Sequence, residues 1–236
     1  MKDQIWERPV HSGRRTCMLM ITHTCNLNCT YCYEKYKSNK VMQFELAKKL
    51  ILKECKVVQE DPRFRELEID LMGGEPMMNF TLIRQLVEWA EMEPLSVPYV
   101  FFMVTNGTLF DEERKDWFRQ HKNRIVVGAS FDGTFEMQEE NRKTLEGSVD
   151  MDFFQTTWPE QGFHMTISQE TLPHLAEGVL EMQRKGYLLE ASLAQGIEWT
   201  DRDAQIYLEQ LYILSDAYLH APELCPINLL TVSPLI

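Results

Sequence analysis

The chain has 236 residues, of which 44% are hydrophobic and 25% are charged, and its formal net charge is -12. This length and composition suit one large globular α/β domain, which can bury a full core without disulfides or metal ions. The acidic balance argues against nucleic acid as a partner, because an acidic chain is a poor counterion for phosphate backbones.

Short apolar, β-rich runs alternate with longer amphipathic stretches along the chain. The predicted strands cover residues 17–24, 67–72, 98–105, 124–131, 162–168 and 187–194. The predicted helices lie at about 41–59, 80–92, 111–120, 172–185 and 201–220, and residues 132–160 are polar and irregular, with one or two short helices. Six alternations predict an α/β fold with a parallel sheet and right-handed crossovers. In such sheets the functional site lies at the carboxyl ends of the strands.

The amino terminus, MKDQIWERPVHSGRR, lacks the apolar core of a secretory signal peptide, and no stretch reaches the roughly 18 apolar residues of a membrane span. We therefore expect a cytoplasmic protein with no membrane partner. Cysteines stay reduced in that compartment, so a tight group of them indicates metal binding or catalysis rather than disulfides. The chain contains six cysteines: Cys17, Cys25, Cys29, Cys32, Cys55 and Cys225.

Three of these cysteines directly follow the first predicted strand, in the segment CNLNCTYC. Their close spacing lets a short loop place three thiolates around one centre. Three soft thiolates suit zinc or an iron–sulfur cluster, whereas a closed structural zinc site requires a fourth ligand. On a cluster of four irons, three cysteines leave one iron open to bind a substrate.

This pattern, Cys25-x3-Cys29-x2-Cys32 with the aromatic Tyr31 before the last cysteine, resembles the signature of the radical S-adenosylmethionine (SAM) superfamily. The resemblance implies a partial (β/α)6 barrel at 17–220, an amino-terminal extension at 1–16 and a tail at 221–236. It also implies two cofactors, one 4Fe–4S cluster held by the three cysteines and SAM on the open iron. In this family, an electron from the cluster cleaves SAM to a 5'-deoxyadenosyl radical, which abstracts hydrogen from a substrate.

The segment Gly73-Gly74-Glu75-Pro76 follows the second predicted strand and resembles the family motif that binds the SAM amino group. Glycines let the backbone approach a ligand closely and adopt positive φ. Backbone carbonyls and a carboxylate suit an ammonium, which only donates hydrogen bonds. An ordinary glycine–proline turn is the alternative reading.

Polar residues also follow the next two strands. By the same resemblance, Asn106 is expected beside SAM or substrate, and Ser130 and Asp132 match the S-x-D-G segment of peptide-modifying members, where the serine approaches SAM. Arg142 is expected to pair with the SAM carboxylate, because a guanidinium donates two parallel hydrogen bonds. It stands in EENR here rather than in the H-D-x-x-R of related enzymes. Plain turns and an exposed helix arginine are the alternatives.

On the fifth predicted strand, His164 and Thr166 alternate and share one face with Ser168. One face of a barrel strand points inward, so these side chains could line the SAM or substrate cavity. A buried, hydrogen-bonded polar set with no binding role explains the alternation equally well.

The segments CNLNCTYCYE, MGGEP, TNG and SFDG together resemble sulfatase-maturating enzymes and maturases of ribosomal peptides. The resemblance implies an oxidoreductase with a peptide or protein substrate and a flavodoxin or ferredoxin as electron donor. Those enzymes usually carry an additional cysteine-rich domain, whereas only Cys225 follows the last helix here, so one cluster is expected. The alternatives are an activase of glycyl radical enzymes, a small-molecule radical SAM enzyme, and a zinc-binding scaffold on a decayed barrel.

Overall fold

The structure, a computed structural model, describes residues 13–230 and contains six strands. They are β1 (Arg14–Thr22), β2 (Glu66–Gly73), β3 (Tyr99–Thr105), β4 (Ile125–Ala129), β5 (Phe163–Ile167) and β6 (Leu189–Leu193). The first four form a parallel sheet in chain order, and β5 pairs with β6 in parallel. A parallel bridge between Ser130 and His164 joins the two sheets, so the strands follow one another as in an open barrel.

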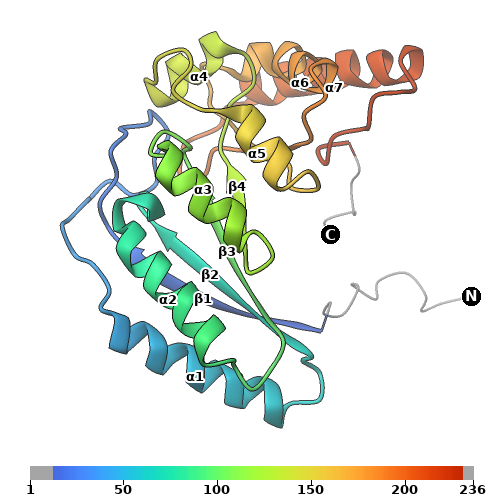
Figure 1. Cartoon of the computed structure of the whole chain (residues 1–236). Coiled ribbons are helices and arrows are strands. Elements are labelled where there is room, and N and C mark those ends of the chain that lie inside the picture. Colours follow the sequence, from blue (N-terminus) through green and yellow to red (C-terminus); the bar gives the residue numbers. More distant parts are fainter. Residues whose placement is uncertain (1–12, 231–236) are drawn as a thin grey trace, which may run out of the picture.

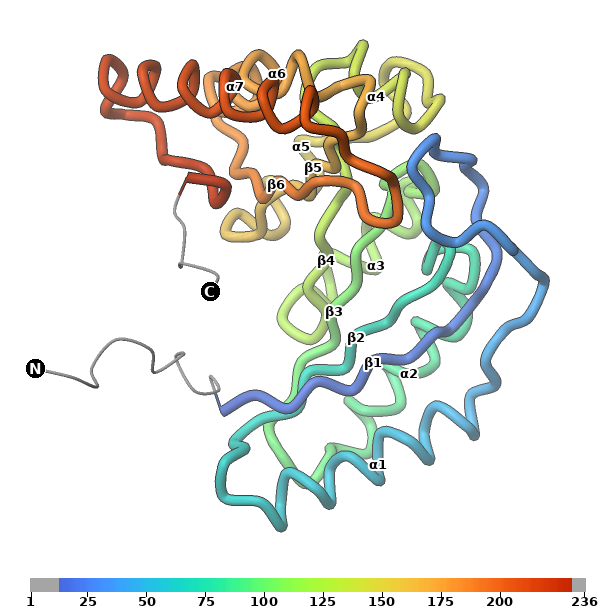
Figure 2. The backbone as a smooth tube through the Cα atoms, turned by 180° about the vertical axis from the view of Figure 1, so that it is seen from behind, coloured from blue at the N-terminus to red at the C-terminus, as the bar shows by residue number. Residues whose placement is uncertain are grey.

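The helices separate into two groups (Figure 1). They are α1 (Phe44–Glu60), α2 (Phe80–Met92), α3 (Glu112–His121), α4 (Phe135–Arg142), α5 (Met151–Thr157), α6 (Leu175–Arg184) and α7 (Asp201–His220). The first three cover one face of the four-stranded sheet, whereas α4 to α7 gather around its far end with β5 and β6. Figure 2 shows the opposite side of the sheet, along which no helix runs beside β1 and β2.

Strand alternation explains why only one face of the sheet carries the main core. Leu67, Ile69 and Leu71 of β2 are fully buried against the helices. The intervening Glu68 and Asp70 point to the other face and are only half-buried. The inner face of the barrel is therefore partly polar and accessible, which suits a site for a ligand.

A second core cluster packs β5 and β6 against α6 and α7. Leu214 of α7 and Ile227 of the following tail are both buried in it. A capping box between Thr200 and Asp203 begins α7. None of the helices in residues 13–230 combines the length and apolar character needed to cross a membrane.

The predicted α/β partial barrel is confirmed, with all six strands in the expected order. The first strand begins at Arg14 and ends at Thr22, earlier than the apolar run at 17–24 suggested. The irregular segment 132–160 contains α4 and α5, and a 3-10 turn at Leu172–His174 precedes α6. Residues 1–12 and 231–236 lie outside the described part, so the limits of the expected extension and tail stay predictions.

Candidate functional site

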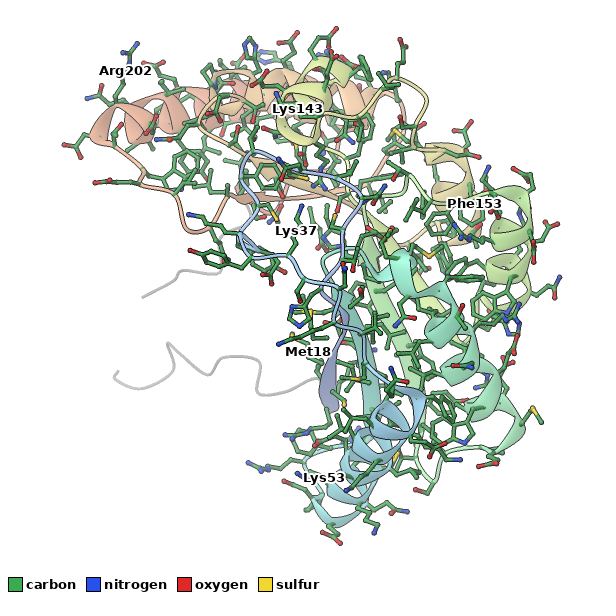
Figure 3. All side chains as sticks on the ribbon, turned by 90° about the vertical axis from the view of Figure 1, so that its left-hand side faces the viewer. Met18, Lys37, Lys53, Lys143, Phe153 and Arg202 are labelled. Carbon is green, nitrogen blue, oxygen red and sulfur yellow. The ribbon has the colours of Figure 1, made fainter. Side chains whose placement is uncertain are left out.

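The three cysteines lie in the loop that follows β1, at the carboxyl end of the sheet. They line a cavity of about 300 Å³, and all three thiols are free and half-buried. The loop turns between Cys29 and Cys32, whose amide donates to the Cys29 carbonyl (3.2 Å). The Leu27 amide donates to Cys25 Sγ (3.4 Å), as is suitable for a thiolate ligand. Figure 3 shows Lys37, which also lines the cavity, on this loop above β1.

Burial raises the pKa of the Cys25 and Cys29 thiols, although the charges of Lys37 and Arg142 partly offset this for Cys25 and Cys29 respectively. A desolvated thiol loses its proton less readily, and metal binding requires the thiolate. Binding of a metal centre at these two residues would therefore release protons.

The donor set fits a polynuclear cluster better than a single ion. Among residues 13–230, no three His, Cys, Asp or Glu side chains are grouped closely enough to hold one metal ion. Three thiolates distributed around a cavity can instead grip the separate irons of a 4Fe–4S cube. Because this set provides three protein ligands, it matches a cube with one iron left for another ligand.

The glycine segment after β2 supports the cysteine loop directly. The Gly74 amide donates to the Thr22 carbonyl (3.0 Å), and the Glu75 amide to the Thr24 carbonyl (2.8 Å). A Cβ on Gly74 would lie 2.7 Å from the Thr24 carbonyl oxygen and 3.1 Å from Cys25 Cβ. Neither Gly73 nor Gly74 has positive φ, contrary to that part of our expectation. Glycine is required here because two backbone segments touch.

Glu75 is almost completely buried, at 1% exposure, and its carboxylate is hydrogen-bonded to other groups of the protein. It accepts hydrogen bonds from the Thr105 hydroxyl (2.7 Å) and from the amides of Asn106 (2.7 Å) and Met77 (2.9 Å). Burial raises its pKa, and these three donors act against that shift. Pro76 is also buried, but it begins a 3-10 turn (Pro76–Asn79) and does not line the cavity.

Asn106 lines the cavity and connects the end of β3 to the cysteine loop. Its side-chain amide donates to Asn26 Oδ1 (2.9 Å), and its Oδ1 accepts from the hydroxyl of Thr108 (2.8 Å). Asn26 in turn donates to the Thr108 hydroxyl (2.8 Å). The amide group therefore holds the loop beside the sheet.

Asp132 and Arg142 form a buried ion pair, of which Arg142 lines the cavity and Asp132 lies behind it. Thr134 is the N-cap residue of helix α4, its hydroxyl accepts from the Met137 amide (3.3 Å), and the helix ends at Arg142. Arg142 donates from Nε and Nη2 to the two carboxylate oxygens of Asp132, at 2.9 Å each. The bidentate geometry predicted for a SAM carboxylate is therefore found with a carboxylate of the protein itself.

The same carboxylate reaches the cysteine loop and β5. Asp132 Oδ2 accepts from the Tyr31 hydroxyl (2.8 Å), and Oδ1 accepts from the Thr166 amide (2.8 Å). The Arg142 guanidinium lies 5.5 Å from the centre of the Tyr31 ring. Burial, followed by the charge of Asp132, raises the pKa of the Tyr31 phenol. Asp132 thus joins four segments of chain around one buried charge pair.

Two of the remaining predicted residues line the cavity and one does not. Ser130 and Thr166 lie in the cavity wall, at the carboxyl ends of β4 and β5. His164 lies farther down β5, against Gly128, with its ring 3.5 Å from Gln161 Nε2 and 3.9 Å from Glu190. Burial lowers the pKa of His164. Asp132, although adjacent in the fold, is also outside the lining.

Sequence reasoning missed two charged residues of the cavity, Lys37 and Asp70, of which Asp70 lies within a strand. The Asp70 side chain is half-buried, and burial followed by the charge of Glu68 raises its pKa to about 6. The available signal was an aspartate between Ile69 and Leu71 in a strand, where this residue type is depleted.

Comparisons with known proteins agree with this geometry. A family model described as a 4Fe-4S single cluster domain matches residues 12–152. An uncharacterised protein of Methanocaldococcus jannaschii is 34% identical over 121 residues, which are 51% of this chain and 40% of that protein. The radical SAM cyclopropyl synthase TigE of Paramaledivibacter caminithermalis is 27% identical over 57% of this chain and 30% of its own.

The sulfatase-maturating resemblance is confirmed as well. A cysteine-type anaerobic sulfatase-maturating enzyme of Clostridium novyi is 27% identical over 50% of this chain and 32% of its own. The solved structure of native anSMEcpe with bound AdoMet and the Kp18Cys peptide superposes with a TM-score of 0.73 at 17% identity, covering 92% of this chain and 64% of that one. The chain thus spans less than half the length of these curated relatives.

Proposed function

The chain belongs to the 4Fe-4S single cluster domain family of radical SAM-type proteins, and on that premise we propose that it is a radical SAM enzyme that modifies a peptide or protein side chain. The observation that carries the proposal is the convergence of three free cysteines and the glycine segment on one cavity at the carboxyl end of the sheet. Of the residues predicted for cofactor binding, Tyr31, Asn106, Ser130, Arg142 and Thr166 line the same cavity.

The cysteines would hold a 4Fe–4S cluster, which, when bound, supplies the electron that cleaves SAM to a 5'-deoxyadenosyl radical. Gly73 and Gly74 would keep the cysteine loop seated on β2, and their carbonyls are suited to the SAM ammonium. Ser130, whose amide donates to the Thr105 carbonyl (2.8 Å), offers a hydroxyl in the cavity wall. The buried ion pair of Asp132 and Arg142 would hold the cysteine loop, α4 and β5 in fixed positions around the cavity.

Two observations favour a peptide or protein over a small molecule. One of the solved structures that share this fold holds a peptide together with AdoMet. The inner face of the barrel, below the cavity, also stays accessible, with Met18 of β1 63% exposed there. Figure 3 shows Met18 below Lys37, on the side of the sheet away from α2 and α3. An extended chain can lie along such a surface.

The direct test is anaerobic reconstitution with iron and sulfide, followed by reduction with dithionite in the presence of SAM. We expect 5'-deoxyadenosine and methionine in the wild-type protein without any peptide. Incubation with peptides in deuterated and protiated form then assigns the substrate, because abstracted deuterium appears in 5'-deoxyadenosine. A reconstituted protein that binds SAM but never yields 5'-deoxyadenosine would contradict the enzymatic proposal.

A further inference from the structure

The charges of the cavity are unequally partnered. Its lining contains four ordinarily charged side chains: Lys37, Asp70, Glu75 and Arg142. The Lys37 ammonium donates to the Leu27 carbonyl, and Glu75 and Arg142 have the hydrogen-bond partners described above. The carboxylate of Asp70 makes no hydrogen bond and no ion pair within residues 13–230. One carboxylate is therefore left available to a ligand in a cavity whose other charges are occupied.

The surroundings of Asp70 make an unpaired carboxylate unfavourable there. In the sheet register its neighbours are Met18 on β1 and Phe102 on β3, both apolar. Burial raises the pKa of Tyr33 in the cysteine loop, followed by the charges of Cys32 and Glu34, and Asp70 adds the smallest contribution. A charge beside apolar groups costs free energy unless a partner compensates it, and such groups concentrate at functional sites.

The wider inner face has the same sign of charge. Glu66 and Glu68 of β2 share a single arginine, Arg14, at 2.6 Å and 2.9 Å. Glu190 of β6 is 63% exposed on the opposite strand of the open barrel. Negative groups on both sides of a concave surface attract cations and repel anions.

We propose that Asp70 is a specificity-determining residue that binds a cationic side chain, lysine or arginine, of the peptide substrate. The inference rests on the proposed function. Asp70 precedes Gly73 by three residues, which is roughly 10 Å along a strand. The cation would therefore lie deeper in the barrel than the glycine segment.

The experiment is a selection of random decapeptides, by display on messenger RNA, on the reconstituted protein with SAM. It compares wild type, Asp70→Asn and a control, Glu113→Gln, which removes an exposed carboxylate of α3 outside the cavity. We expect wild type and control to enrich a basic residue at one position, and Asp70→Asn to lose that enrichment. Synthetic peptides then measure affinity with lysine against norleucine and arginine against citrulline. Wild type and the control should bind the charged member of each pair about tenfold more tightly than the neutral member. Asp70→Asn should bind the two members equally.

Three results would overturn the proposal. They are selected peptides without a basic residue, an unchanged preference in Asp70→Asn, and a loss of SAM affinity in that variant, which would assign the carboxylate to the cosubstrate. Cleavage of SAM by the wild-type protein without peptide reports the proposed function separately. Active cleavage with no basic preference refutes only the role of Asp70, whereas absent cleavage refutes the enzyme.

Discussion

Two regions of the site differ in whether their carboxylates have hydrogen-bond partners within the protein. At the carboxyl ends of the strands, Glu75 and Asp132 are 1% and 0% exposed, and each accepts at least three hydrogen bonds. Lower on the inner face, Asp70 is half-buried and has no partner among residues 13–230. The first arrangement is self-sufficient and holds the loops in place. The second is incomplete without a ligand. The first region therefore stabilises the fold, whereas the second is suited to binding a substrate.

The largest effect of a substitution, the loss of the cluster, is expected in the cysteine loop. Replacing Cys25, Cys29 or Cys32 singly by alanine should abolish cluster assembly, because a cube cannot be held by two protein ligands in an open cavity. Iron and sulfide analysis after anaerobic reconstitution measures this. Cys225→Ser is the matched control, since that thiol is exposed and far along the chain, and it should keep full iron content. Normal iron content in all three alanine variants would show that the cysteine loop does not hold the cluster.

A smaller but still severe effect is expected at the buried ion pair. Asp132→Asn leaves the Arg142 guanidinium buried without its counter-charge, which typically costs about 3–5 kcal/mol. Urea denaturation of the protein without cluster measures the loss of unfolding free energy. Glu140→Gln removes the exposed partner of Lys143 on the same helix and should change stability by less than about 1 kcal/mol. Equal effects of the two substitutions would show that the pair does not hold the scaffold.

At Glu75, an amide retains one acceptor oxygen and places an NH2 group against donors. We expect Glu75→Gln to lower the unfolding free energy by about 2 kcal/mol, since the carboxylate accepts hydrogen bonds from Thr105, Asn106 and Met77. Thermal unfolding measures the change. A melting temperature equal to that of the wild type would mean that the carboxylate is free for a ligand after all.

Replacement of the Asp70 carboxylate should have the opposite effect on stability. Its pKa of about 6 in the fold exceeds the ordinary value of 3.8, so the folded protein holds this proton more tightly than the unfolded chain. Stability is therefore lost as the pH rises from about 4 to about 6, and the loss is complete above that. Asp70→Asn removes the penalty and should stabilise the protein at about pH 8, by about 1 kcal/mol after solvent screening of the half-exposed group. At about pH 4 it should be neutral. A destabilising effect at high pH would show that Asp70 has a partner within the protein.

The fold could be predicted from local patterns, because each strand is a short apolar run and each crossover helix is amphipathic. The beginning of β1 at Arg14 was missed because its first residues are polar and pair with Glu66 and Leu67, which are distant in sequence. The cysteine loop was predictable from the spacing of its three thiols alone. Such signals are local, so a single sequence is sufficient to detect them.

The partners within the site could not be predicted in this way. Tyr31, Asp132, Arg142 and Thr166 meet only because β4, α4 and β5 return to the same end of the barrel. From sequence, Arg142 was expected to bind a carboxylate of SAM, and only the packed structure reveals the competing carboxylate of Asp132. The open state of Asp70 is likewise a property of what the neighbouring strands place beside it.

The central claim is that three thiolates of one loop hold a 4Fe–4S cluster whose remaining iron is open to SAM. Mössbauer spectroscopy of protein reconstituted with isotopically enriched iron tests it, with and without SAM. We expect a cubane spectrum in which a single iron site shifts when SAM is added, while the cysteine-bound sites stay unchanged. A spectrum that does not respond to SAM, or a protein that retains zinc in place of iron, would contradict it.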